Sequence, residues 1–349
     1  MPNVTAERLV EIAKGLLIGA GASEDEAAVI ARYNIGANLA GHDSHGIILI
    51  PQYIERIKAG HIVPQAPWVI TQETATTTVV DGHWGFGYAT TDRAMRYTIE
   101  KAKKQNVAAT TVFRQSHIGR LASYPLLASA EGMIAMITAD SGRSPKHVAP
   151  FGGAKARLGT NPICFAVPSN LEGPLVFDMA TSAAAAGKIN VATARGEQVP
   201  NGWLIDAEGK PSNDPKVLRA GGALLPLGGT EGYKGTGLAA IVEILSGLLT
   251  GLGFGIDPQG RHNDGCFMAV FNVAAFRDLD TFKAEVTDFA HYLKATPPAQ
   301  GFTEVFYPGE IEFRKEQERR KNGVPIEDAT WKRLHDLATG YGIAEKLGF

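Results

Sequence analysis

The chain has 349 residues, of which 44% are hydrophobic and 20% are charged. These values are ordinary for a globular protein and exclude disorder as the main state, while the length leaves room for one large or two fused α/β units. Lys and Arg number 34 against 36 Asp and Glu, giving a formal net charge of −2. This balance excludes a strong attraction to nucleic acid or to an anionic membrane.

Cysteine usage and apolar runs bear on the cellular compartment. Cys164 and Cys266 stand alone, without the CxxC spacing of a zinc site or a disulfide framework, which fits a reducing compartment. No apolar run reaches the roughly 18 residues of a membrane-spanning helix. Glu7 and Glu11 fall in a helical pattern where a signal peptide would be apolar. We therefore expect a cytoplasmic protein.

The first third of the chain predicts helices and then an alternation of strands and helices. Ser23 and Glu26 form an S-x-x-E capping box before a helix that ends at Gly41, and a second helix is expected over residues 51–58. Asp81-Gly82 predicts a turn after the first strand. The alternating elements are expected at residues 76–80 (strand), 89–104 (helix), 107–113 (strand), 121–131 (helix) and 133–138 (strand). Such alternation indicates an α/β sheet covered by helices.

The remainder of the chain completes this body. Two apolar runs, 163–167 and 175–179, predict strands joined by a hairpin or an irregular loop, and residues 236–247 predict an apolar, buried helix. A late strand at 266–273 could return to the first sheet. We expect a helical N-terminal segment (1–75), a central α/β body (76–307) and a helical C-terminal segment (308–349).

The densest polar cluster is Gly-His-Asp-Ser-His-Gly at residues 41–46. A helix C-terminus with solvated polar residues is one explanation, because turns favour Gly, Asp and Ser. A metal site is disfavoured, since His42 and His45 have no obvious further ligand nearby. The composition remains hard to explain by packing alone.

A second polar cluster, residues 114–120, follows the predicted strand 107–113 and so lies at its carboxyl end, where open α/β sheets gather ligands. His117 would titrate near neutral pH and could exchange a proton with a substrate oxygen. Arg120 could bind a carboxylate or a phosphate. An equally good interpretation is structural, with His117 partly buried and hydrogen-bonded to the backbone and Arg120 exposed on the surface.

Glycine-rich segments offer backbone N–H groups to an anion at residues 151–162 and 232–237, although a plain loop and helix cap would have similar composition. Residues 85–90 imitate the dinucleotide motif G-x-G-x-x-G. The third glycine, however, is Thr90, and no acidic residue lies near position 110. The sequence contains neither a P-loop nor a G-x-S-x-G elbow.

In their order along the chain, these motifs resemble the type-2 malate/L-lactate dehydrogenase family. The matching segments are residues 42–46 with Pro51, Tyr53 and Arg56, then 116–119, 149–153, 158–162, 177–182 and 234–238. The resemblance extends from about residue 5 to the C-terminus. Residues 38–46 and 308–310 are most similar to the hydroxycarboxylate dehydrogenase branch, which reduces bulky 2-oxo acids.

This resemblance implies a nicotinamide-dependent oxidoreductase using NAD, or alternatively NADP, and forming a homodimer. The implied fold is a non-Rossmann α/β fold like that of L-sulfolactate dehydrogenase, with a large mixed sheet covered by helices. By the same resemblance His117 is the general acid/base, and Ser44 and His45 lie beside the nicotinamide and the substrate carbonyl. The implied cofactor-binding residues are His45, Gly119, Arg120, Leu121, Asn161, Val176, Phe177, Asp178, Met179, Ala180, Tyr233, Lys234, Gly309 and Glu310.

One departure from the family pattern bears on the substrate. Many relatives have an arginine where this chain has Leu49, and Tyr233 replaces a common histidine. Losing a bidentate carboxylate clamp disfavours dicarboxylates, whereas an apolar wall favours an aromatic or aliphatic side chain. Arg120 or Arg56 would then bind the C1 carboxylate, with Tyr53 in the same substrate-binding group.

The sequence therefore predicts an enzyme that interconverts 2-oxo acids and 2-hydroxy acids. Two alternatives stay open: a reductase of cyclic imine carboxylates, and a binding homologue without catalysis. Retention of Ser44, His45 and His117 argues against the second alternative.

Overall fold

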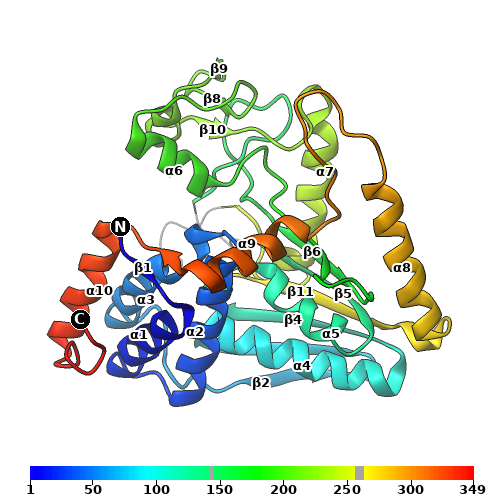
Figure 1. Ribbon diagram of the computed structural model, residues 1–349, viewed down its shortest axis with the longest axis horizontal. Coiled ribbons are helices and arrows are strands. Elements are labelled where there is room, and N and C mark those ends of the chain that lie inside the picture. Colours follow the sequence, from blue (N-terminus) through cyan, green and yellow to red (C-terminus); the bar gives the residue numbers. More distant parts are fainter. Residues whose placement is uncertain (141–144, 256–262) are drawn as a thin grey trace.

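The computed structural model describes residues 1–140, 145–255 and 263–349, and its centre is a seven-stranded mixed sheet (Figure 1). The strand order is β2-β3-β4-β11-β5-β6-β7, in which β3 and β4 are parallel and all other neighbours antiparallel. The strands are β2 (Val69–Glu73), β3 (Thr77–Gly85), β4 (Val107–Gln115), β5 (Met133–Ala139), β6 (Ile163–Val167), β7 (Leu175–Met179) and β11 (Cys266–Asn272). The expected large mixed sheet is confirmed.

Strand β11 is the last strand of this sheet in sequence but lies in its middle. It pairs with β4 on one side and β5 on the other, so Val270 faces both Ala108 and Ala135. A strand that is paired on both edges and covered on both faces has a nearly continuous run of apolar residues, as residues 266–273 do. The predicted return of this strand to the first sheet is confirmed.

Two helices pack on one face of the sheet, and the N-terminal helices lie beside it. The capping box is confirmed: Ser23 Oγ accepts the Glu26 N–H at 3.2 Å, and the Glu26 carboxylate accepts the Ser23 N–H at 3.0 Å. The N-terminal helices are α1 (Ala6–Gly19), α2 (Glu24–Leu39) and α3 (Ile50–Lys58), and those packed on the sheet are α4 (Gly87–Gln105) and α5 (Pro125–Ser129). Their apolar faces and the sheet share one core.

Two local predictions near the sheet are wrong. Asp81-Gly82 is not a turn, because β3 continues to Gly85 through a bulge in which His83 and Trp84 adopt positive φ. The helix expected over 121–131 is a 3₁₀ turn (Leu121–Ser123) followed by α5, because proline at position 125 favours the first turn of a new helix. Strand β2 was not anticipated.

A smaller body sits above one end of the sheet (Figure 1). It contains α6 (Ala186–Arg195) and a three-stranded sheet of order β10-β8-β9. Its short strands are β8 (Leu204–Ile205), β9 (Pro211–Ser212) and β10 (Ala223–Leu224). Ile189, Leu204 and Leu224 belong to an apolar core separate from that of the main body.

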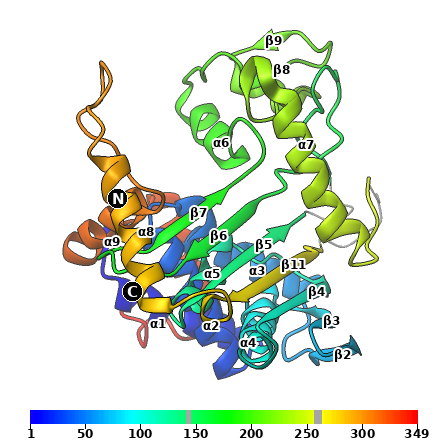
Figure 2. The same ribbon diagram turned by 90° about the vertical axis from the view of Figure 1, so that its right-hand side faces the viewer.

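The apolar helix near residue 240 is α7 (Gly232–Glu243), continued by a π-helical turn (Ile244–Leu248). The expectation that it is buried is wrong: Ile241 is 52% exposed and Ile244 46%. Figure 2 shows α7 and α8 (Leu279–Lys294) at opposite sides of the sheet, with β6 and β7 between them. Along the described residues, no helix is long and apolar enough to cross a membrane.

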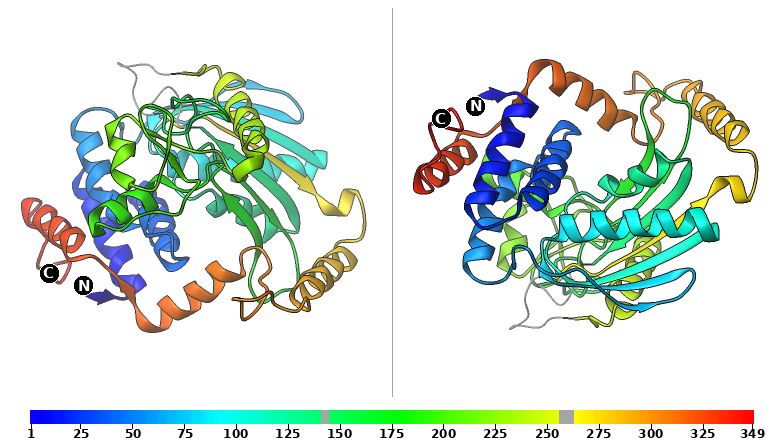
Figure 3. Two further views of the ribbon diagram at one scale, coloured as in Figure 1. Left: turned by 90° about the horizontal axis from the view of Figure 1, so that it is seen from above. Right: turned by 90° about the horizontal axis from the view of Figure 1, so that it is seen from below.

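The C-terminal segment packs back onto the N-terminal helices. Its elements are α9 (Glu310–Asn322), β12 (Val324–Pro325) and α10 (Asp328–Gly340), and β12 pairs with β1 (Asn3–Val4). This pairing brings the two termini to the same side of the molecule (Figure 3). Helix α9 contacts α2 near the polar cluster at 41–46.

Candidate active site

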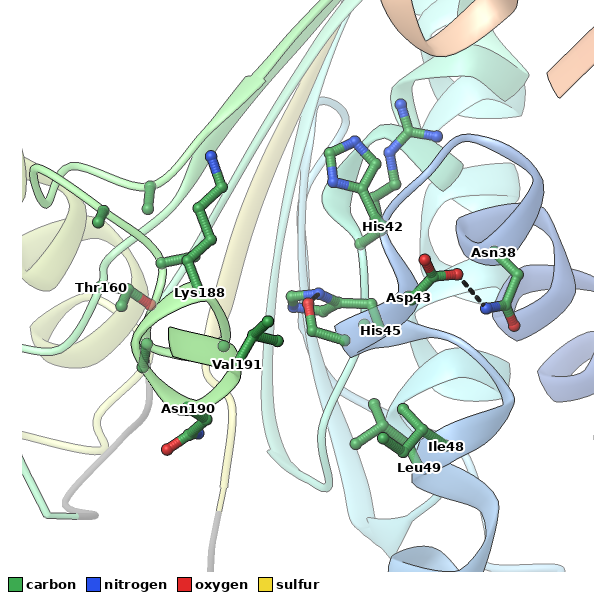
Figure 4. A pocket seen from close by; sticks show the side chains of 18 of the residues that line it. Asn38, His42, Asp43, His45, Ile48, Leu49, Thr160, Lys188, Asn190 and Val191 are labelled. Atoms are coloured by element: carbon green, nitrogen blue, oxygen red, sulfur yellow. Dashed lines mark hydrogen bonds between the residues drawn. The ribbon is translucent and has the colours of Figure 1, made fainter. Parts of the chain in front are cut away.

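A cavity of about 1080 Å³ lies between the main body and the smaller body. Residues 42–45, 47–49, 119–121 and 178–180 line one side of it, and residues 182–188, 190 and 191, which include the start of α6, line the other (Figure 4). The predicted site residues that line this cavity are Ser44, His45, Leu49, Gly119, Arg120, Leu121, Asp178, Met179 and Ala180. Three segments that are far apart in the sequence are thus brought together.

Residues 41–47, here called the histidine turn, follow α2 and contain a 3₁₀ turn (Asp43–His45), and the Asn38 side chain bonds to the residues at both ends of it. The Asn38 amide donates from Nδ2 to Asp43 Oδ1 at 2.7 Å, and its Oδ1 accepts the Ile47 N–H at 2.8 Å. A Cβ on Gly46 would come within 2.2 Å of Asn38 Oδ1, so only glycine fits there. The sequence analysis assigned no role to Asn38.

Ser44 and His45 present their side chains to the cavity. Ser44 Oγ lies 3.1 Å from His45 Nδ1. Burial lowers the pKa of His45 to about 4, helped by the nearby positive charges of His42 and Arg120. The His45 imidazole is therefore neutral at physiological pH and can act as a hydrogen-bond donor or acceptor.

His117 does not line the cavity but lies next to His45. The two imidazole rings are 5.7 Å apart and inclined by 28°. His117 Nδ1 lies 2.7 Å from the Tyr53 hydroxyl, which is 3.2 Å from the Tyr88 hydroxyl. Asn34 Nδ2 in turn donates to the Tyr88 oxygen at 2.7 Å. His117 therefore ends a hydrogen-bonded chain that runs into the core.

The G-x-G-x-x-T segment at 85–90 supports His117 through close backbone packing. The Gly87 N–H donates to Ser116 Oγ at 3.1 Å, and a Cβ on Gly87 would lie 2.1 Å from the Ser116 carbonyl oxygen. Gly119 has φ +74°, and a Cβ there would lie 2.2 Å from the Tyr88 hydroxyl. The glycines thus let α4 pack against residues 116–119, which explains why they imitate a nucleotide motif.

A buried carboxylate that the sequence analysis missed also touches this segment. Asp264 Oδ2 accepts the Ile118 N–H at 3.1 Å, and the Asp264 N–H donates to the Gln115 carbonyl at 3.2 Å. Only the placement of β11 beside β4 brings residue 264 to this position, so no local sequence signal could have found it.

Arg120 and Asp178 form a half-buried pair on the cavity wall. The Arg120 Nε and an Asp178 oxygen are 3.7 Å apart, and Asp178 also accepts the Ala122 N–H at 2.8 Å. Burial raises the pKa of Asp178, whereas Arg120 and this hydrogen bond oppose the rise. Among the described residues, Arg120 Nε has no hydrogen-bond acceptor. A ligand in the cavity could supply one.

Several predicted residues lie outside the cavity lining. Tyr53 is buried behind His117, and Arg56 is half-buried on α3. Asn161 has φ +38° and donates to Glu243 Oε2 at 2.8 Å, so its side chain faces α7 while its neighbours Thr160 and Pro162 line the cavity.

The other predicted residues that do not line the cavity lie on β7, at the start of α7 and at the start of α9. Val176 is buried and donates its N–H to the Pro308 carbonyl at 3.1 Å, beside Gly309. Glu310 pairs with Lys294 and Arg314, which anchors α9. Three further predicted residues are exposed to solvent: Phe177 (42%) on β7, and Tyr233 and Lys234 on α7.

Residues on α6 form the cavity wall that the sequence analysis missed. A Cβ on Gly187 would lie 2.9 Å from Ser44 Cβ, so the smaller body packs directly against Ser44. Lys188 and Val191 also line the cavity, facing the His42 and His45 side (Figure 4). In the described part of the chain Lys188 forms no ion pair. The small-residue run at 183–187 carried no recognisable signal.

Comparison with known proteins agrees with this architecture. L-sulfolactate dehydrogenase of Methanothermobacter thermautotrophicus is 34% identical over 342 residues, covering 96% of both chains. Hydroxycarboxylate dehydrogenase B of Escherichia coli K12 is 33% identical, covering 93% of this chain and 91% of the relative.

Solved structures show the same fold. Sulfolactate dehydrogenase from Methanocaldococcus jannaschii matches with a TM-score of 0.88 at 32% identity, covering 98% of each chain, which confirms the predicted fold. Δ1-Piperideine-2-carboxylate reductase from Pseudomonas syringae matches with a TM-score of 0.84 at 28% identity, covering 97% of this chain and all of the other. The malate/L-lactate dehydrogenase family model matches residues 4–335. The chain therefore belongs to the malate/L-lactate dehydrogenase family.

Proposed function

We propose that the protein interconverts 2-oxo acids and 2-hydroxy acids by hydride transfer with a nicotinamide dinucleotide. The observation that carries this proposal is the cavity in which Ser44 and His45 stand in front of His117 and its buried tyrosine pair. Such a transfer needs a group that gives a proton to the substrate oxygen in one direction and removes it in the other. His117 has this role in the proposal.

The tyrosine pair suits a reversible acid/base. When His117 Nδ1 carries a proton and donates to Tyr53, which then donates to Tyr88, Nε2 of the neutral imidazole is bare and can accept a proton. The imidazolium that results can return this proton from Nε2 to the substrate oxygen while Nδ1 still donates to Tyr53. Burial holds the Tyr53 pKa well above its usual value, so the phenol stays protonated in both states of the imidazole. The hydrogen bond from Nδ1 to Tyr53 therefore keeps its direction throughout.

The cavity residues fit a dinucleotide cofactor. The cavity volume of about 1080 Å³ is at the upper end of the range for small-molecule sites, which is enough for a dinucleotide and a small acid together. Arg120 Nε lacks an acceptor within the described residues and lines the same wall. Gly119, Arg120, Leu121 and residues 178–180 would hold the dinucleotide, whose nicotinamide ring gives or takes the hydride when bound. We propose NAD in preference to NADP.

The substrate's side chain is assigned to the apolar end of the cavity. Ile48 and Leu49 line this end, with Val191 of α6 on the opposite wall (Figure 4). This lining favours an aromatic or branched aliphatic side chain over a second carboxylate. Lys188, which lines the cavity without an ion pair in the described residues, supplies the cation for the C1 carboxylate. Arg56 does not line the cavity.

The test is oxidation of NADH, and then NADPH, with phenylpyruvate, pyruvate, oxaloacetate and a cyclic imine carboxylate offered separately. Turnover with phenylpyruvate above oxaloacetate supports the proposal and identifies the cofactor. Turnover with the imine alone favours C=N reduction, the activity named for the reductase that shares this fold. Failure to bind either dinucleotide would favour a binding protein without catalysis.

We also propose that the protein is a homodimer acting in the cytoplasm. Met136, Phe165 and Phe177 are cross-strand neighbours on β5, β6 and β7, so their side chains share one face of the sheet, and Phe177 is 42% exposed. Figure 2 shows β6 and β7 between α7 and α8. Ile241 of α7 and Leu248 of the π-helical turn that follows it are also exposed, so this region matches the apolar patches that mark subunit interfaces. Light scattering after gel filtration should give a dimer for the wild type and a monomer for Phe177→Glu. Phe302→Glu, at a 71% exposed residue elsewhere, is the control.

A further inference from the structure

One face of helix α9 lies along the histidine turn. Glu312, Lys315 and Arg319 are spaced three and four residues apart, so they share that face. His42 Nε2 lies 3.5 Å from Glu312 Oε1, and a Cβ on Gly41 would come within 3.1 Å of Lys315 Cγ. Arg319 contacts Asp43, the residue after His42. Three consecutive residues of the histidine turn thus lie against this face of α9.

The contact of Arg319 is the strongest of the three. Its guanidinium donates to Asp43 Oδ1 at 2.6 Å and to Asp43 Oδ2 at 2.9 Å, a bidentate geometry that fixes orientation as well as distance. The same guanidinium donates to the Asn38 carbonyl oxygen. Its side chain is only 13% exposed, so Asp43 is the main compensation for its charge.

These contacts form a continuous line around Ser44 and His45. Arg319 holds Asp43, Asp43 accepts from Asn38 Nδ2 at 2.7 Å, and Asn38 Oδ1 accepts the Ile47 N–H at 2.8 Å. The two residues that face the cavity are thus bracketed on both sides by atoms of one network. Without Arg319, only the Asn38 amide would hold Asp43.

We propose that Arg319 is a positioning residue for Ser44 and His45, acting through Asp43 and without touching the ligand. Arg319 is not among the residues that line the cavity. This assignment rests on the proposed function only in that the cavity is taken as the site of the reaction. It adds the C-terminal helix to the parts of the chain on which turnover depends.

The test is a double-mutant cycle of Arg319→Met and Asp43→Asn, read as kcat and as the Kd for NADH. Arg320→Met is the matched control, because Arg320 pairs within α9 with Glu316 at 2.6 Å and does not reach the turn. We expect Arg319→Met to lower kcat about tenfold relative to the control, with the Kd for NADH changed less than twofold. Arg319→Lys should recover part of the loss. The double variant should lose no more than the worse single variant, because both remove the same contact.

A kcat for Arg319→Met equal to that of Arg320→Met, or single effects that multiply in the double variant, would overturn the proposal. The second readout is the His45 ring resonance in NMR spectra, identified by its loss in His45→Asn. Arg319→Met should shift it and Arg320→Met should not. If the wild type reduces none of the offered acids, the proposed function fails, and this resonance still decides the role of Arg319. An unshifted resonance then contradicts it.

Discussion

The two walls of the cavity are built in different ways. On the main body, residues 41–47 are held by hydrogen bonds and ion pairs from α2 and α9, and Ser44 and His45 are fixed within that network. On the smaller body, α6 begins without a side-chain cap and presents Lys188 and Val191 to the cavity. The first wall holds the proposed reacting groups in a fixed geometry. The second wall offers side chains that contact the part of the ligand that differs between substrates. Changes on the first wall should therefore reduce kcat, and changes on the second should alter KM and substrate preference.

The largest effect is expected at the acid/base. His117→Ala should lower kcat by roughly 10²–10⁴-fold, the usual contribution of a positioned acid or base, because no proton could then reach the substrate oxygen. The Kd for NADH, measured by fluorescence, should stay the same, since His117 bonds to Tyr53 and lies beside the His45 ring, and is not among the residues proposed to hold the dinucleotide. His335→Ala, at a half-exposed histidine on α10, is the control. An unchanged kcat would remove His117 from the mechanism.

On the opposite wall, Lys188→Met should raise KM for the 2-oxo acid by roughly 10–100-fold, the scale of a hydrogen bond to a charged group. The kcat should change far less, because the carboxylate is bound equally in the ground state and the transition state. Lys188→Arg should restore part of the affinity. A raised Kd for NADH with an unchanged KM would instead place Lys188 at the cofactor.

Substrate preference should follow the apolar end of the cavity. Leu49→Arg should raise kcat/KM for oxaloacetate relative to phenylpyruvate by roughly tenfold or more, since it introduces a bidentate carboxylate partner and removes an apolar contact. Ile18→Arg, at an apolar residue on α1 that is 36% exposed, controls for the added charge. If the ratio does not change, the substrate side chain lies elsewhere in the cavity.

The contact between the walls offers a direct test of the comparison. Gly187→Ala would place a methyl group 2.9 Å from Ser44 Cβ, so α6 must move away or Ser44 must rotate. We expect kcat/KM to fall about tenfold with little loss of thermal stability, because the strain is relieved by opening the cavity. Gly237→Ala on α7, where nothing lies within 4 Å, should leave kcat/KM unchanged. Equal activity of the two variants would mean that the walls need not touch.

The sequence predicted parts of the wall on the main body and missed the wall formed by α6. The Ser23–Glu26 box and six of the seven strands of the large sheet were predictable because capping and periodicity are local, and the motif order indicated the segments at 41–46 and 116–119. Asn38 lay in a matching segment without an assigned role, and Arg319 carried no signal, since it is separated from Asp43 by 276 positions in the sequence. Residues such as Asn161 and Glu310 match family motifs but are placed to anchor α7 and α9. A motif identifies residues that matter without identifying what they touch.

The smallest expected effect concerns the pH dependence of stability. The folded-state pKa of His45 is about 4, below its usual 6.5, because burial and the charges of His42 and Arg120 disfavour the imidazolium. The unfolded chain therefore binds a proton at this residue between pH 6.5 and 4 that the folded chain does not. The resulting stability is fully present above pH 6.5 and is lost as the pH falls towards 4, by at most about 3 kcal/mol.

Urea unfolding of the wild type and His45→Asn at several pH values would measure this linkage. The free energy of unfolding should fall less steeply with acid in His45→Asn than in the wild type, whatever the absolute stability of the variant. His335→Asn should keep the wild-type slope, because His335 is 47% exposed in its side chain. Parallel slopes for the wild type and His45→Asn would mean that His45 is as well solvated as an exposed histidine. The histidine turn would then be more open to water than the wall described above, and the contrast between the two walls would be smaller.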